Sequence, residues 1–252
     1  MENVTSNQLA KDFMKLGLKK NDIVLIHSSL KSIGRVEGGA DAVIDALLYV
    51  LGEEGTLIVP ALTGKRENSP SNPPVFDVLK SPCWTGTIPE TLRKRQEAIR
   101  SIHPTHSVSA IGAKKYEITK GHELSYSPCD DKSPYYKNAI MGGFILFIGV
   151  AQESNTSIHM CEELAQVPYH LQKEVTHMIA TGYDGEKTVV KNRLHDWEKP
   201  ETDFNKLDEL YKTNTIMKIG KIGKSTTRLI NAASMLDFTV DLLRKEPLFL
   251  LV

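Results

Sequence analysis

Cysteine is scarce in this chain, with only three among 252 residues. Cys83, Cys129 and Cys161 lie 46 and 32 positions apart, and none of them forms a C-x-x-C pair. An odd number of widely spaced cysteines builds neither a disulfide framework nor a four-cysteine metal site. We therefore expect a protein of the reducing cytoplasm.

The sequence also lacks an excess of charge and a long apolar run. Lys and Arg total 31, and Asp and Glu also total 31, so no global field attracts nucleic acid or a membrane surface. The longest apolar stretch, Phe144 to Ala151, is too short to cross a bilayer, and residues 1–10 carry no signal-peptide pattern. These absences predict a soluble, unexported protein that binds neither nucleic acid nor membrane.

What the sequence does contain is an alternation of strand and helix patterns. Apolar runs at 23–26, 56–61 and 144–150 are typical of strands buried on both faces of a sheet. Helix-spaced apolar residues at 7–16 and 40–51 end at glycines, and Asn231 can cap a helix that stops before Pro247. This alternation predicts an α/β fold in one domain, 1–252. We expect two irregular insertions. One is the proline-rich loop at 64–82, and the other is the segment 181–208, which has a hairpin tip at 182–185.

A first candidate site follows the strand at 23–26. The strand leads through Ser28 and a glycine-containing loop, 32–39, to the helix that starts near Ala40. Backbone N–H groups and the positive end of the helix dipole can hold a phosphate at such a point. Two alternatives stay open: the glycines only turn the chain, or Asp41 occupies the helix N-terminus instead.

A second candidate is the H-x-x-H segment within Arg100 to Ser107. Pro104 argues against a helix here, and His103 and His106 have no thiolate partners nearby in the sequence, which makes a poor zinc signature. The alternative is a proline turn whose histidines bond to the backbone.

The third candidate is the most informative. The strand at 144–150 is followed by Ser154, Asn155 and Thr156, which can cap a helix that carries His159 and Glu162 on one face. A carboxylate beside an imidazole orients the ring and stabilises its protonated form, as a general base near neutral pH requires. An ordinary surface pair is the alternative, but ligands of open α/β sheets bind just past the ends of such strands. Cys161 would turn away from His159 on this helix, so we do not expect an acyl-thiol route.

Together, several segments resemble the aminoglycoside 3-N-acetyltransferase family. They are His27-Ser28-Ser29-Leu30, Ile33-Gly34, Gly38-Gly39, Gly52 to Pro60, Arg100 to Ser107, Asp131 to Pro134, Ile148-Gly149-Val150 and the specific run Ser154 to His159 followed by Glu162. The resemblance extends from about Leu16 to Leu243. It implies a three-layer α/β/α sandwich around a mixed, largely buried sheet, and transfer of acetyl from acetyl-coenzyme A directly to an amine, without a metal.

The resemblance also implies roles for individual residues. His159 matches the family's base and Glu162 its supporting carboxylate. The coenzyme A residues would be Ser28, Ser29, Leu30, Ile33, Gly34, Arg35, Val36, Gly38, Gly39, Thr105 and Ser107. A polycationic acceptor favours carboxylates in its site, for which Asp130, Asp131 and Glu163 are candidates.

The departures concern the acceptor. After the H-x-x-E pair the resistance enzymes usually continue with an aromatic residue and an arginine, whereas Glu163 and Leu164 follow here. The 3-amino group of an aminoglycoside is the expected acceptor. A non-antibiotic amine, a silent coenzyme A-binding relative, and a zinc hydrolase using His103, His106 and His159 with Glu162 remain alternatives. A homodimer is left open as the assembly.

Overall fold

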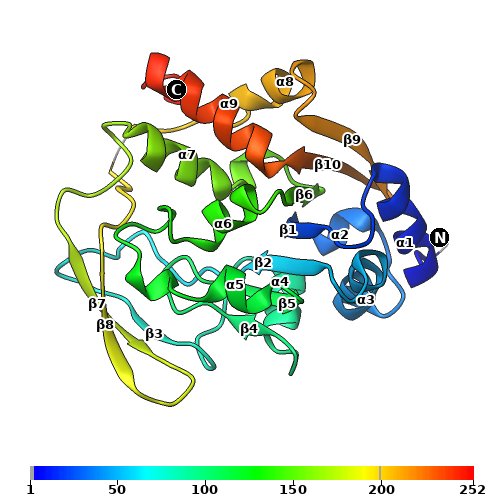
Figure 1. Cartoon of the computed structure of the whole chain (residues 1–252), viewed down its shortest axis with the longest axis horizontal. Coiled ribbons are helices and arrows are strands. Elements are labelled where there is room, and N and C mark those ends of the chain that lie inside the picture. Colours follow the sequence, from blue (N-terminus) through cyan, green and yellow to red (C-terminus); the bar gives the residue numbers. More distant parts are fainter. Residues whose placement is uncertain (1–2, 199) are drawn as a thin grey trace.

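The structure is a computed structural model that describes residues 3–198 and 200–252, and it contains two β-sheets (Figure 1). The strands are β1 Ile23–Ser28, β2 Thr56–Pro60, β3 Val75–Asp77, β4 Ile99–Arg100, β5 Val108–Gly112, β6 Phe144–Ile148, β7 Thr176–Thr181, β8 Lys187–Asn192, β9 Met217–Ile222 and β10 Ser225–Asn231. The α-helices are α1 Ser6–Leu16, α2 Leu30–Ile33, α3 Gly39–Leu51, α4 Thr87–Arg93, α5 Lys115–Thr119, α6 Pro134–Ile140, α7 Ser157–Ala165, α8 Lys206–Thr213 and α9 Ala232–Lys245. Two 3₁₀ turns are η1 His122–Leu124 and η2 Gln152–Ser154.

The large sheet is mixed. Its seven strands lie in the order β4-β5-β2-β1-β6-β10-β9. The three central strands β2, β1 and β6 are parallel, and the outer strands join them antiparallel. The expectation of a mixed α/β fold is confirmed.

The sequence of the central strand β1 is continuously apolar because both of its faces are buried. Val24 and Ile26 belong to one apolar core, which also contains residues of α1, α3 and α4. Ile23 and Leu25 belong to a second core, with residues of α6, α7 and α9. Successive side chains of a strand point to opposite faces, so both faces of this strand need apolar side chains. Figure 1 shows α1 and α3 on one side of β1 and β6, and α6 and α7 on the other.

The helix boundaries follow from local chemistry. The Thr5 side chain accepts a hydrogen bond from Gln8 N at the start of α1, and Asn231 accepts one from Ser234 N at the start of α9. Helix α3 ends at Gly52, which adopts a φ of 67°, a conformation that glycine takes without strain. The helices predicted at 7–16, at 40–51 and after Asn231 are confirmed.

The small sheet corrects two expectations. Its order is β3-β7-β8, and it packs over a core of its own that includes Phe76 and Met178. The prediction of a loop throughout 64–82 is wrong at β3, which pairs in parallel with β7 about a hundred residues away. The region 181–208 likewise contains the whole of the hairpin arm β8, although the tip of the hairpin lies where the glycines predict it. In Figure 1 this hairpin, drawn in yellow, projects away from the large sheet.

The described helices include none with the length and apolarity that crossing a membrane requires.

Candidate functional site

Strand β6 and helix α7 position the candidate base. The chain leaves β6, makes the short turn η2 and enters α7, where Asn155 Oδ1 accepts a hydrogen bond from Ser157 N at 3.2 Å. Of the three predicted capping residues, Asn155 therefore satisfies a donor of the first turn, while Thr156 occupies the N-cap position without a side-chain bond. The result is a helix that starts just beyond the end of a central parallel strand, where the sequence placed it.

His159 and Glu162 form a hydrogen-bonded pair one helical turn apart. His159 Nδ1 lies 2.7 Å from Glu162 Oε2, and the side chains are 19% and 0% exposed. Burial alone would raise the pKa of Glu162, but the charge of His170 and the hydrogen bond from His159 hold that pKa well below its usual range. Because one partner is fully buried, an ordinary surface pair does not describe this arrangement.

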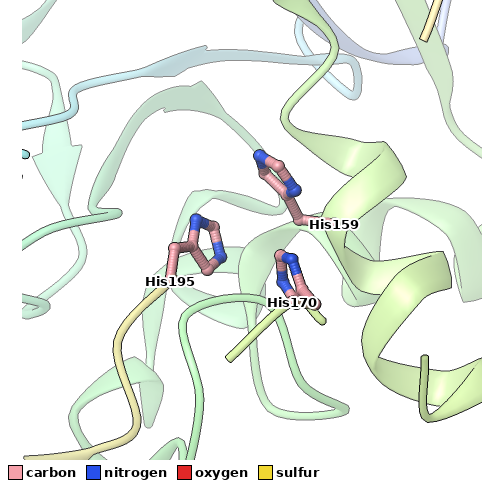
Figure 2. A group of neighbouring side chains, drawn as sticks. All are labelled: His159, His170 and His195. Atoms are coloured by element: carbon pink, nitrogen blue, oxygen red, sulfur yellow. The ribbon is translucent and has the colours of Figure 1, made fainter. Parts of the chain in front are cut away.

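Two further histidines join the pair from other parts of the chain. His170 follows α7, and His195 follows β8. The ring centroids of His159 and His170 are 4.9 Å apart, and His195 lies 4.3 Å from each of them. Figure 2 shows the three rings approaching one another from three segments of the chain.

The three clustered imidazoles are close enough to be considered as metal ligands. Within 3–198 and 200–252, two groups bring ligand atoms within 4.8 Å of one another: His159 with His170 and His195, and Cys129 with Glu163 and His195. Neither group includes His103 or His106, so the residue set of the alternative zinc hydrolase does not come together. His170 Nδ1 lies 3.1 Å from Glu162 and its Nε2 lies 3.5 Å from Glu163. Carboxylates beside both ring nitrogens favour protons there over a metal ion.

A cavity of about 410 Å³ opens beside His159. His159 and His195 line it, and its charged side chains include Lys65 and Glu153. Its other walls combine polar residues, among them Ser28, Asn68, Thr85 and Asn155, with apolar ones, among them Trp84, Trp197, Phe204, Leu62, Leu194 and Val150. Such a mixed lining with a few convergent polar groups is typical of a small-molecule site.

The predicted coenzyme A loop approaches this cavity at one end. Ser28 lines the cavity, whereas Ser29, Leu30, Ile33, Gly34, Arg35, Val36, Gly38 and Gly39 do not. The side chain of Ile33 is fully buried in the core beneath the loop. Ser28 Oγ is a buried polar atom that has no hydrogen-bond partner among the described residues, which fits a wall that meets a polar ligand. Asp41 pairs with Arg95 at 2.7 Å, so its charge is partly compensated.

The H-x-x-H segment forms the proline turn that the sequence left open as the alternative to a metal site. His103 Nδ1 accepts hydrogen bonds from Thr105 N and His106 N, at 3.3 and 3.0 Å. Burial lowers the pKa of both histidines well below the ordinary value, and neighbouring imidazoles add to that effect. Thr105 and His106 line the cavity. Ser107 is fully buried, where its hydroxyl donates to Ala61 O.

The three carboxylates predicted to hold the acceptor lie outside the cavity lining. Asp130 accepts hydrogen bonds from backbone N–H groups of its own loop, and Asp131 is exposed. Glu163 is buried and accepts hydrogen bonds from Ser127 Oγ and Cys129 N. A contact between these residues and an acceptor stays a prediction.

Sequence reasoning missed His170, His195 and Glu153. The two histidines lie 11 and 36 positions after His159, and no metal or catalytic motif has that spacing. Glu153 stands beside the matched run Ser154 to His159, and that position is the signal that could have found it.

Comparisons with known proteins agree with this site. A sequence model described as aminoglycoside 3-N-acetyltransferase matches residues 25–244. The SPbeta prophage-derived aminoglycoside N(3')-acetyltransferase-like protein YokD of Bacillus subtilis (strain 168) is 32% identical, over 93% of this chain and 90% of that protein. Aminoglycoside N(3)-acetyltransferase VII of Streptomyces paromomycinus is 30% identical, over 94% and 90%. The solved structure described as AAC-IIIb binary with CoASH superimposes with a TM-score of 0.84 at 26% identity, over 97% of this chain and 98% of that one. With a cavity beside the hydrogen-bonded His159–Glu162 pair and a family match over most of its length, the chain belongs to the aminoglycoside 3-N-acetyltransferase family.

Proposed function

We propose that this protein transfers acetyl from acetyl-coenzyme A directly to an amine, the 3-amino group of an aminoglycoside. The observation that carries the proposal is the His159–Glu162 pair at the cavity wall, with 2.7 Å between Nδ1 and Oε2. Family membership supplies the reaction class, and the relatives named as aminoglycoside N(3)-acetyltransferases support the acceptor.

The pair would act as a general base. Glu162 holds Nδ1 as the N–H of His159, so the lone pair of the neutral ring is on Nε2. An alkyl ammonium is not a nucleophile, and His159 Nε2 would accept its proton as the amine nitrogen forms a bond to the acetyl carbon. The carbon–sulfur bond then breaks, coenzyme A leaves as the thiol, and the proton on His159 is released. Thr105, which lines the cavity and whose hydroxyl lies 2.9 Å from His106 Nδ1, is a candidate donor to the developing oxyanion.

The chain offers a fit for acetyl-coenzyme A. We propose that the loop of Ser28, Ser29, Leu30, Ile33, Gly34, Arg35, Val36, Gly38 and Gly39 holds it, with Thr105 and Ser107 toward the thioester. Two observations support this coenzyme A site. Ser28 Oγ is buried at the cavity wall without a hydrogen-bond partner among the described residues, and the positive end of the α3 dipole lies at Gly39, the first residue of that helix.

A second acceptor class has an observation in its favour. Lys65 lies on the cavity wall together with Glu153, so the described lining offers one carboxylate and one ammonium group beside its histidines. A polycation gains most from several carboxylates in its site, whereas a less charged amine needs only one. Acetylation of a non-antibiotic amine is therefore the alternative to test beside the aminoglycosides. Asp130, Asp131 and Glu163 are the sequence-based candidates for additional acceptor contacts.

The test follows thiol release from acetyl-coenzyme A with a panel of acceptors: aminoglycosides that have a free 3-amino group, the same compounds acetylated there, and simpler amino sugars. His159→Ala should lower the rate by about 10²-fold or more, the range for a positioned general base, with little change in coenzyme A affinity. His177→Ala is the matched control, because His177 is exposed on β7. Near-full activity of His159→Ala would reject the assignment.

The layer architecture, the cellular location and the assembly of the protein are each proposed from a separate observation. The two apolar cores on the faces of the large sheet support a three-layer α/β/α sandwich. The three free cysteines support a cytoplasmic location. A homodimer is proposed as the assembly to test by sedimentation.

A further inference from the structure

His170 stands between two buried carboxylates on α7. Its side chain is 1% exposed; Nδ1 lies 3.1 Å from Glu162 Oε2, and Nε2 lies 3.5 Å from Glu163 Oε1. The two carboxylates are 0% and 5% exposed. One imidazole thus faces an acidic group with each of its nitrogens, and a protonated ring has a donor for both.

The contact with Glu162 links His170 to the catalytic pair. His159 Nδ1 approaches the same oxygen, Glu162 Oε2, at 2.7 Å, and the two rings stack with an interplanar angle of 23°. Burial would lower the pKa of His170, but the two carboxylates outweigh it and raise that pKa above its ordinary value. Carboxylates beside both ring nitrogens therefore favour the protonated form of His170, close to the ring that would accept a proton.

A positive charge on His170 would counteract the tendency of Glu162 to keep His159 protonated. A buried carboxylate whose only partner is His159 would hold that ring as imidazolium, which cannot act as a base. A second cation on the same oxygen shares the negative charge and leaves His159 free to lose its proton. We propose that His170 is a positioning residue that bridges Glu162 and Glu163 as a buried imidazolium, holds Glu162 Oε2 on His159, and sets the proton affinity of the general base. The proposal rests on the proposed function of His159.

Among the described residues, four other titratable groups surround His170 or its two carboxylates. His195, from the segment after β8, packs on both rings, and its Nε2 lies 3.8 Å from Glu163 Oε1. His106, from the turn before β5, lies behind His195, and burial lowers its pKa. Tyr169 precedes His170, and burial and Glu162 raise the pKa of its hydroxyl. Cys129 lies beside Glu163, and burial raises the pKa of its thiol.

The test separates charge from shape. His170→Gln keeps an N–H donor for Glu162 and removes the positive charge. Without that charge the imidazolium form of His159 is favoured, so the acidic limb of the kcat/KM profile should move to higher pH, by roughly half a unit to two units. The plateau value of kcat should fall by less than about tenfold. Glu162→Gln should move the same limb to lower pH, because it removes a negative charge instead.

His177→Gln on exposed β7 is the matched control and should leave the profile unchanged. A merely structural His170 would lower thermal stability and specific activity without moving the limb. An unchanged limb in a folded His170→Gln protein, or one moved to lower pH, would overturn the proposal.

A second measurement uses the wild-type protein and does not depend on any variant's folding. In ¹⁵N-histidine-labelled protein, one buried ring should keep both nitrogens protonated at a pH just above 6.5, where an ordinary histidine is already mostly neutral. The absence of any persistent imidazolium signal at that pH would overturn the proposal. The proposed function can fail separately: an active His159→Ala enzyme rejects the base, whereas an inactive one together with an unmoved His170→Gln profile rejects only the role of His170.

Discussion

Replacing Glu162 by glutamine is the sharpest test of the proposed catalytic role of the His159–Glu162 pair. The substitution preserves the shape of a side chain that is 0% exposed and removes the charge that pairs with His159 at 2.7 Å and His170 at 3.1 Å. Because both partners are imidazoles and the group is buried, the change acts on protonation more than on packing.

The magnitude follows from the geometry. A hydrogen bond to a charged group contributes about 1.5–3 kcal/mol, and one pKa unit corresponds to about 1.4 kcal/mol. Loss of the carboxylate therefore makes the His159 imidazolium easier to deprotonate by roughly one to two units. The acidic limb of the rate profile should move to lower pH by that amount, and the plateau rate should fall by about 10- to 100-fold, since a weaker base removes the amine proton less readily.

The assay is thiol release from acetyl-coenzyme A over pH 5–9 at saturating and limiting acceptor, with coenzyme A affinity measured separately. If the pair were a surface contact, it would contribute under about 1 kcal/mol to stability and nothing to rate. An unshifted acidic limb together with a wild-type plateau rate in a folded Glu162→Gln enzyme would refute the reasoning.

Three further predictions concern binding and stability. Coenzyme A should raise the melting temperature, corresponding to about 2.7 kcal/mol at a hundred times its Kd, and Ser28→Val should weaken that shift; no shift of wild type at millimolar coenzyme A would reject the binding site. Acetylation of a polycationic aminoglycoside should slow as salt rises from low to about 0.3 M, because screening weakens its attraction to Glu153; a salt-independent kcat/KM would indicate that charge does not guide this acceptor. Burial lowers the pKa of His27 to about 3 and lowers that of His122 well below 6.5. In the folded protein both rings therefore stay neutral, whereas in the unfolded chain they take up a proton in acid. As the pH falls below about 6.5, each ring should lower the free energy of unfolding by about 1.4 kcal/mol per pH unit. Urea unfolding at pH 7.5 and 5.5 measures this loss, and equal stability at the two values would contradict it.

The sequence by itself determined the elements in which local signals agree. The continuous apolar runs of β1, β2 and β6 require burial on both faces, and capping residues with terminal glycines set the limits of α1, α3 and α9. The pair His159 and Glu162 was also readable, because i and i+3 positions share a face wherever a helix forms. These features depend on residues within about one helical turn or one strand.

Only the tertiary structure decided what surrounds that pair. Strand β3 exists because β7 pairs with it, and nothing in Val75–Asp77 announces a partner so distant in sequence. His170 and His195 reach His159 from separate segments, since the chain turns back after α7 and again after β8. Contacts between residues far apart in sequence depend on how the elements pack, which a spacing rule cannot express. For this reason the histidines that surround His159 and Glu162 were not visible until the chain was folded.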